Sequence, residues 1–315
     1  MMTISDQSLA NNTKEYLEID IAGYKIPCFI VHGKNKGKNI LITAQIHSGE
    51  HTGTAAIIKI LQSLKSNQVS GNLICFPCVN ISGFWHNTID VVYEDNGNLN
   101  KVFPGSDKGL STAIARYFVK EIFPYVNFVL DLHAGSYNEI LTPCLFYPTD
   151  PKVKEKSLAI ATNLSIKYLL PSSSKVGLLS YAANVMGIPG LLLERGYGGI
   201  CKREWIEDYT RDLRLALKAL GAIRTEDEID IERSIFQEVI YVSASVDGLW
   251  YPNIEVDQII SKGSILGHLE DFEGKILKEY LSICDGIVLY YRHSLNAKKD
   301  TNLVAYGVID SCYKS

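Results

Sequence analysis

Three short segments of the chain carry residues suited to catalysis, and the first is QIHSGE at 45–50. It lies at the carboxyl end of an apolar run and directly before a helix pattern. His47 and Glu50 are three residues apart, so one tight turn would bring an imidazole and a carboxylate onto a common metal ion. Such pairs also occur by chance, and a surface turn without a metal is an equal alternative for this segment alone.

The second segment is Asp131-Leu132-His133, again at the end of an apolar run. Two histidines and one carboxylate, with a fourth position left for water, form the ligand set of a catalytic zinc. Asp131 would then orient one of the ligands by a hydrogen bond. The alternative is that His133 is an ordinary core histidine.

The third segment is LLLERG at 191–196, in which Glu194 directly follows three leucines. A zinc-bound water needs a base that takes its proton and passes it to the leaving amine, and Glu194 suits that role. A salt bridge at the same edge is the alternative. The polar loop NLNKVFPG at 98–105 offers amides and a cation for a substrate carboxylate or carbonyl, although it could equally be a capped turn.

These segments require a scaffold that brings strand ends together, and the first two-thirds of the chain alternates strand and helix patterns. An open α/β sheet places its sites at the carboxyl edge of the strands. We therefore predict an α/β fold with a mixed sheet covered by helices. Strands are expected at 24–32, 39–46, 71–79, 125–132 and 189–194, and helices at 52–66, 110–123, 154–167 and 203–220.

The pattern changes after the acidic stretch TEDEIDIE at 225–232. Short β-rich runs separated by glycine-containing turns follow it. We predict a catalytic domain at 1–224, an acidic linker at 225–232, and a small all-β barrel or sandwich domain at 233–315.

The composition limits the function classes. The chain has 315 residues, a net charge of −4, and 46% hydrophobic residues, which is enough for a sizeable core. This charge gives no reason to expect a nucleic-acid or anionic-membrane partner, and no run approaches the ~18 apolar residues of a membrane helix. The start lacks a signal-peptide pattern, and the seven scattered cysteines suggest buried thiols in a reducing cytoplasm. We expect a cytoplasmic enzyme.

Taken in order, HSGE, NLNKVFPG, DLH and LLLERG resemble the succinylglutamate desuccinylase/aspartoacylase family, which are zinc deacylases related to the zinc carboxypeptidases. The resemblance covers roughly residues 20–222. It implies a zinc-carboxypeptidase-like mixed sheet, often followed by a β-barrel domain. It also implies one zinc ion per chain, held by His47, Glu50 and His133, with Glu194 as general base and acid. The substrate-binding pair of the family falls on Asn100 and Lys101.

Two positions depart from the family pattern. The family carries arginine where this chain has Lys101, and lysine keeps the charge but loses the planar fork that grips a carboxylate. An arginine that polarises the scissile carbonyl in many members falls on Ile89 here. We consider His86 and Arg195 as candidates for that missing group.

The resemblance implies a zinc-dependent hydrolase that cleaves the amide bond of a small N-acylated amino acid or amine. A carboxypeptidase-like peptidase with the same metal centre is one alternative. A catalytically impaired zinc-binding or ligand-binding protein is another, suggested by Ile89. The acyl group, the amine and the oligomeric state stay open.

Overall fold

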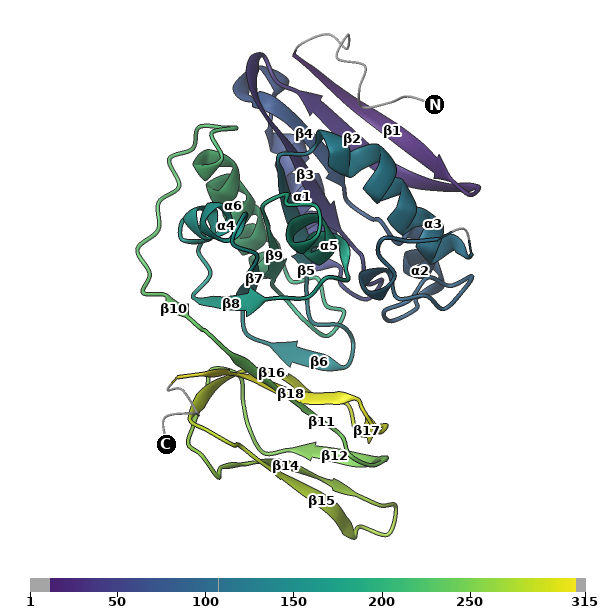
Figure 1. Ribbon diagram of the computed structural model, residues 1–315, viewed down its shortest axis with the longest axis vertical. Coiled ribbons are helices and arrows are strands. Elements are labelled where there is room, and N and C mark those ends of the chain that lie inside the picture. The colour runs from purple at the N-terminus through teal and green to yellow at the C-terminus, as the bar shows by residue number, and fades with distance from the viewer. Residues whose placement is uncertain (1–11, 107, 310–315) are drawn as a thin grey trace.

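The computed structural model describes residues 12–106 and 108–309, and its largest element is a nine-stranded mixed sheet (Figure 1). The order of strands is β1-β2-β4-β3-β5-β9-β7-β8-β10. Parallel pairing joins β4, β3, β5 and β9 at its centre, whereas β1, β2 and β7 pair antiparallel with β2, β4 and β9 respectively. The strand bounds are Thr13–Ile21 (β1), Tyr24–His32 (β2), Asn35–Ala44 (β3), Ser70–Phe76 (β4), Phe128–His133 (β5), Cys144–Pro148 (β7), Tyr168–Ser172 (β8), Gly190–Glu194 (β9) and Ser234–Ile235 (β10).

Helices cover both faces of this sheet because its central strands are apolar on both faces. In β3, Ile40 and Ile42 pack into one hydrophobic cluster and Leu41 packs into another, and all three are fully buried. One face is covered by α1 (Thr52–Ser63), α4 (Lys154–Ala161) and α6 (Arg203–Ala219), and the other by α3 (Leu110–Tyr117) and α5 (Leu178–Asn184). The short α2 spans Ile81–His86, and single helical turns lie at Ser66–Gln68, Leu99–Lys101, Phe118–Ile122 and Phe123–Tyr125.

The residues after β10, together with the earlier strand β6, form two antiparallel sheets, in agreement with the β-rich pattern of the sequence. The five-stranded sheet contains β11 (Val239–Ser243), β13 (Ile259–Ile260), β16 (Gly286–Arg292), β18 (Asn302–Val308) and β6 (Glu139–Leu141). The four-stranded sheet contains β12 (Gly248–Pro252), β14 (Ile265–Glu270), β15 (Ile276–Leu281) and β17 (Asn296–Ala297). A core that includes Trp250, Leu266 and Tyr306 belongs to both sheets.

Two strand pairings join the C-terminal sheets to the rest of the molecule. β6 leaves the N-terminal part of the chain and pairs antiparallel with β16, and Figure 1 shows it between the two parts. β10 pairs parallel with β8 at the edge of the large sheet. A small apolar cluster that includes Tyr168, Phe236 and Leu289 fills the space beside these pairings.

The structure also tests the predictions about the cysteines and about membrane-spanning helices. Cys28, Cys75, Cys78, Cys144 and Cys201 are free thiols, as expected, and all but Cys201 are buried. Cys284 is disulfide-bonded, so the expectation of thiols is wrong for that residue. Within the described part of the chain, no helix is both long enough and apolar enough to cross a membrane.

Candidate active site

The predicted site residues lie at the carboxyl ends of three neighbouring parallel strands. The strand register pairs Ala44 of β3 with Leu132 of β5, and His133 of β5 with Glu194 of β9. Because parallel strands end at one edge, the segment after β3 and the last residues of β5 and β9 meet there. The polar residues that follow or end these apolar strands therefore lie together at the carboxyl edge of the sheet.

The turn that carries His47 and Glu50 is held by backbone and side-chain hydrogen bonds. Gln45 adopts a left-handed conformation with φ of 59°, and its amide nitrogen donates to the Ser48 carbonyl. The amide of Gly49 donates to the carbonyl of Ile89 over 2.9 Å, and the Ser48 hydroxyl donates to the same carbonyl over 3.1 Å. Position 89 therefore supports the turn through its backbone, while its side chain is 40% exposed.

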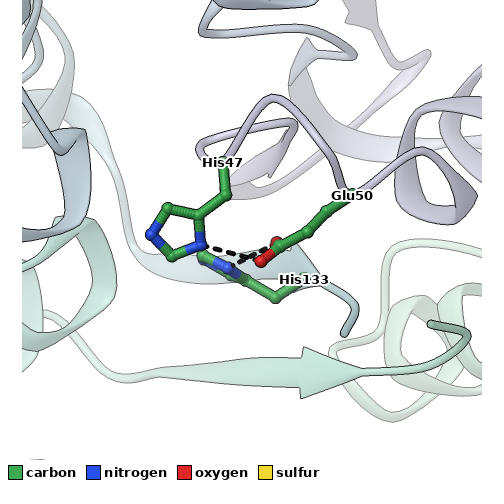
Figure 2. A group of neighbouring side chains, drawn as sticks. All are labelled: His47, Glu50 and His133. Carbon is green, nitrogen blue, oxygen red and sulfur yellow. Dashed lines mark hydrogen bonds and ion pairs between the residues drawn. The ribbon is translucent and has the colours of Figure 1, made fainter. Parts of the chain in front are cut away.

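His47, Glu50 and His133 form one compact group, with their ligand atoms within 4.8 Å of one another (Figure 2). His47 Nδ1 lies 2.8 Å from Glu50 Oε1, and His133 Nδ1 lies 2.9 Å from Glu50 Oε2. The sequence-predicted ligand set is thus brought together with both imidazoles facing the same carboxylate.

The outer nitrogen of each imidazole lies near an oxygen, although His133 Nε2 makes no hydrogen bond among the described residues. His47 Nε2 lies 3.2 Å from Asn98 Oδ1, an oxygen that also accepts the Asn100 backbone N–H. His133 Nε2 lies 3.3 Å from Asp131 Oδ2. When Nε2 of each imidazole carries the proton, both Nδ1 lone pairs face the carboxylate of Glu50, and a cation bound between them would stabilise that arrangement. The donor set therefore fits a divalent metal such as zinc, with two nitrogens and one carboxylate.

The same arrangement shifts the pKa values of the three residues. Burial favours the neutral form of Glu50, but the two adjacent imidazoles outweigh it and lower the pKa of Glu50 to about 2. Burial alone would lower the pKa of His47 and His133, but the Glu50 carboxylate raises both. The ionised Glu50 carboxylate thus stabilises positive charge between it and the two imidazoles, as the carboxylate of a cation-binding site does.

Glu194 is held differently from Glu50. It ends β9, and its Oε2 is buried without a hydrogen-bond partner among the described residues. Burial is the main reason that the pKa of Glu194 is raised, to about 8, and the Glu50 carboxylate adds to the effect. A carboxyl group with a pKa close to neutral can both accept and return a proton at neutral pH.

These residues line one cavity of about 560 Å³, a size that suits a small molecule. His47, Glu50, His133 and Glu194 all face it. Asn100 and Lys101 also line it, and the Asn100 side-chain oxygen accepts the Leu178 backbone N–H over 3.2 Å. The structure therefore places six of the eight site residues expected from the sequence around a single space.

Arg195 and His86 require a correction, because neither is among the residues that line the cavity. Side chains of successive strand residues point to opposite sides, and Arg195 directly follows Glu194. Its Nε and Nη2 donate to the buried Asp212 of α6 over 2.9 and 2.6 Å. The ring of His86 stacks on Tyr93 with 3.8 Å between ring centroids. Both side chains thus make contacts outside the cavity, Arg195 with Asp212 and His86 with Tyr93.

Sequence reasoning missed the wall of the cavity that comes from the C-terminal sheets. Tyr290 and Arg292 of β16 line it, together with Glu139 of β6. These strands are far apart in the sequence and meet only through the β6–β16 pairing. No local pattern could have indicated that meeting.

A family comparison decides where this chain belongs. The model of the succinylglutamate desuccinylase/aspartoacylase catalytic domain matches residues 36–220, which is more than half of the chain. The chain belongs to this family. The matched residues include the three strand ends and the loop with Asn100 and Lys101, so the desuccinylase/aspartoacylase catalytic domain contains the predicted site.

Relatives of this desuccinylase/aspartoacylase family member extend over almost the whole chain. The N-alpha-acetyl-L-2,4-diaminobutyric acid deacetylase of Halomonas elongata is 25% identical over 91% of this chain and 86% of its own length.

Solved structures share the fold over a similar extent. The product-bound ectoine utilization protein EutE (DoeB) of Ruegeria pomeroyi has a TM-score of 0.85 at 22% identity, covering 95% of this chain and 97% of that one. A succinylglutamate desuccinylase/aspartoacylase of Rhodobacter sphaeroides has a TM-score of 0.82 at 22% identity, covering 96% and 98%. The similarity thus includes the C-terminal sheets as well as the catalytic domain.

Proposed function

We propose that this protein is a zinc-dependent amidohydrolase that removes the acyl group from a small N-acylated amino acid. The observation that carries the proposal is the presence, in one cavity, of a two-histidine, one-carboxylate group and of Glu194, whose buried Oε2 has no hydrogen-bond partner among the described residues. Family membership and the deacetylase activity named for the Halomonas relative support it. An N-acetyl amino acid with a second amine is therefore a substrate to test first.

His47, Glu50 and His133 would hold one zinc ion through Nδ1, a carboxylate oxygen and Nδ1. When bound, zinc polarises the acyl carbonyl and lowers the pKa of a coordinated water. Glu194 accepts a proton from the attacking water on Oε2 and returns it to the nitrogen of the leaving amine. The amide C–N bond then breaks, and an acid and a free amine result.

The surrounding residues hold the substrate. Asn100 uses its Oδ1 on the Leu178 amide, which keeps the side chain in place and leaves its Nδ2 for a substrate oxygen. Lys101, whose side chain is exposed at the cavity, supplies a positive charge.

We also propose that residues 1–224 form a catalytic domain, 225–232 a linker, and 233–315 a small barrel or sandwich domain. Because residues of the last part line the cavity, this domain restricts access to it. Small acylated amino acids would then react in preference to peptides.

The proposal is tested with purified protein and a panel of N-acetyl and N-succinyl amino acids, with and without zinc, beside dipeptides and tripeptides. Zinc-dependent release of amine from the N-acyl amino acids is expected. Preferential cleavage of peptides would identify a carboxypeptidase instead. Zinc binding without turnover of any compound would indicate an impaired, ligand-binding protein.

A further inference from the structure

The cavity has a charged wall formed by the pairing of β6 and β16. In that antiparallel pairing, Glu139 lies directly opposite Arg292. Directly opposed residues in an antiparallel pair place their side chains on the same face, and both of these side chains line the cavity. The pairing therefore puts a carboxylate and a guanidinium on one face, lining the same cavity as His47, Glu50 and His133.

The guanidinium of Arg292 is held by neutral groups. Its Nε donates to the Asn296 carbonyl over 2.8 Å, and its Nη2 donates to Asn296 Oδ1 over 3.3 Å. The ion pairs found within residues 12–106 and 108–309 do not include Arg292. A fixed guanidinium without a carboxylate partner is suited to bind an anion through the rest of its fork.

The carboxylate of Glu139 is likewise held by neutral donors. Its Oε2 accepts the Ser136 backbone N–H over 2.9 Å, and its Oε1 accepts the Tyr290 hydroxyl over 3.4 Å. Burial raises the pKa of Glu139 above its ordinary value, so the ionised form gains from a nearby cation. Asp90 and Asp300 also line the cavity. With Glu139 they make three carboxylates, against the two cations Lys101 and Arg292.

We infer that this wall binds a substrate that carries both a carboxylate and an ammonium group, with the carboxylate on Arg292 and the ammonium on Glu139. The two side chains share a face yet bond to other groups rather than to each other, so each charge remains for the ligand. The substrate class is an N-acylated amino acid with a second, free amine. This inference rests on the proposed amidohydrolase function and adds the residues that select the substrate.

Three matched compounds test it: N-α-acetyl-2,4-diaminobutyrate, its α-carboxamide, which lacks the carboxylate, and N-acetyl-2-aminobutyrate, which lacks the ammonium. Arg292→Gln should lower kcat/KM for the first compound by about 10- to 100-fold and leave the carboxamide nearly unchanged, because a hydrogen bond to a charged group is lost. Glu139→Gln should lower it by a similar factor and leave N-acetyl-2-aminobutyrate nearly unchanged. Arg203→Gln is the matched control, because that guanidinium is 94% exposed on α6.

A direct binding measurement removes the dependence on turnover. Calorimetric titration of each zinc-loaded variant with free 2,4-diaminobutyrate should show weaker binding for Arg292→Gln and Glu139→Gln than for the wild type and Arg203→Gln. If Arg292→Gln fails to fold, Arg292→Lys keeps the charge without the fork and should weaken the same compound by a smaller factor.

The outcomes separate the two proposals. Equal losses for the acid and the carboxamide in Arg292→Gln would overturn the assignment of Arg292, and a selective loss in Lys101→Gln instead would move the carboxylate to Lys101. Equal losses with and without the ammonium in Glu139→Gln would overturn its role. If the wild type hydrolyses neither these three compounds nor the other N-acyl amino acids of the panel, the amidohydrolase proposal fails. Weaker binding of free 2,4-diaminobutyrate by Arg292→Gln and Glu139→Gln would still support the binding roles of these two residues.

Discussion

At the scale of single residues, the two imidazoles that share one carboxylate determine what the site can hold. The outer nitrogens of His47 and His133 lie 3.2 and 3.3 Å from oxygens of Asn98 and Asp131, and with a proton on each of them the inner nitrogens present lone pairs to Glu50. Protonation of the imidazoles, whose pKa values Glu50 raises, or a divalent metal bound between the three groups removes the repulsion between those lone pairs and the carboxylate. The identity of the ligand atoms therefore follows from the oxygen partners around the imidazoles.

Replacing His133 with alanine should remove most of the bound metal, because the site would lose one of its three proposed protein ligands. The measurement is zinc per chain after dialysis against a weak chelator, expected near one in the wild type and far below one in His133→Ala. His86→Ala is the control, because its imidazole stacks on Tyr93 outside the cavity. Full zinc occupancy in His133→Ala would exclude His133 as a ligand.

Replacing Glu194 with glutamine keeps the shape of the side chain but removes its ability to take a proton. We expect kcat to fall by about 100-fold or more while zinc content stays unchanged, in line with the usual size of general acid–base catalysis. Steady-state kinetics and metal analysis on the same preparation check this. Turnover close to that of the wild type would show that another group serves as the base.

The raised pKa of Glu194 also predicts a pH-dependent cost to the stability of the metal-free protein. Its ordinary value is 4.5 and its folded value about 8, so between these pH values the unfolded chain releases this proton and the native chain keeps it. Native stability therefore falls as pH rises through that window, by at most about 1.4 kcal/mol per pH unit. Glu194→Gln lacks this loss and should be the more stable protein at pH 8.

Denaturant unfolding of the metal-free wild type and the metal-free Glu194→Gln variant between pH 4.5 and 8 measures the difference in their free energies of unfolding. The two free energies of unfolding should agree near pH 4.5 and diverge as pH rises. A constant difference across the window would mean that Glu194 titrates alike in the folded and unfolded chain.

At the scale of elements, the ends of β3, β5 and β9 determine which residues reach the site. Apolar runs that finish in polar residues were visible in the sequence, and parallel pairing brings their ends together. The central sheet, and the grouping of His47, Glu50, His133 and Glu194 at one edge of it, could be predicted for that reason. Arg195 could not be excluded from the sequence, because adjacency along the chain suggests proximity whereas strand alternation sends the side chain to the other side.

Other elements escaped prediction because their signals are weak or non-local. β1 alternates half-buried and exposed residues, several of them charged, so its pattern lacks a strong apolar face. α5 is only seven residues long, and the expected helix at 154–167 ends at Ala161. Glu139 and Arg292 meet only after β6 pairs with β16, and no spacing in the sequence encodes such a pairing.

The link between β9 and α6 supplies a prediction about Arg195. Its guanidinium and the Asp212 carboxylate form an ion pair in which both residues are buried. Arg195→Met leaves that carboxylate without its partner, so we expect a loss of about 3–5 kcal/mol in the free energy of unfolding. Urea unfolding checks this, with Arg203→Met as the exposed control.

Substrate preference distinguishes the structural role of Arg195 from the role in binding that the sequence suggested. Arg195→Met should leave the ratio of kcat/KM between matched acid and amide substrates unchanged. A changed ratio of kcat/KM at unchanged free energy of unfolding would show that Arg195 contributes to substrate binding.

At the scale of the whole molecule, the cavity belongs to both parts of the chain, and the apolar cluster beside it holds them together. Phe236 is 4% exposed in that cluster, and its ring lies against Gly307 of β18. Leu289 of the same cluster also lines the cavity. The packing between the two parts therefore bears directly on the shape of the site.

Phe236→Ala should lower the free energy of unfolding by about 3–5 kcal/mol, because it empties a large buried volume. It should also raise KM while zinc content stays unchanged, because the wall of the cavity loses support. Phe272→Ala is the control, since that ring is 94% exposed. Unchanged KM at reduced stability would mean that the cluster holds the molecule together without shaping the site.

The pairing of β6 with β16 has a consequence for how the protein is made. A ribosome releases His47, Glu50, His133 and Glu194 early, whereas Arg292, Asp300 and Asn302 of the cavity wall follow on the order of ten seconds later at ~5–20 residues per second. During that interval a nascent chain already carries the side chains proposed to bind metal but lacks the part of the cavity wall that β16 and the residues after it supply. On the proposed role of Arg292, selection between substrates is therefore the last property of the site to form during synthesis.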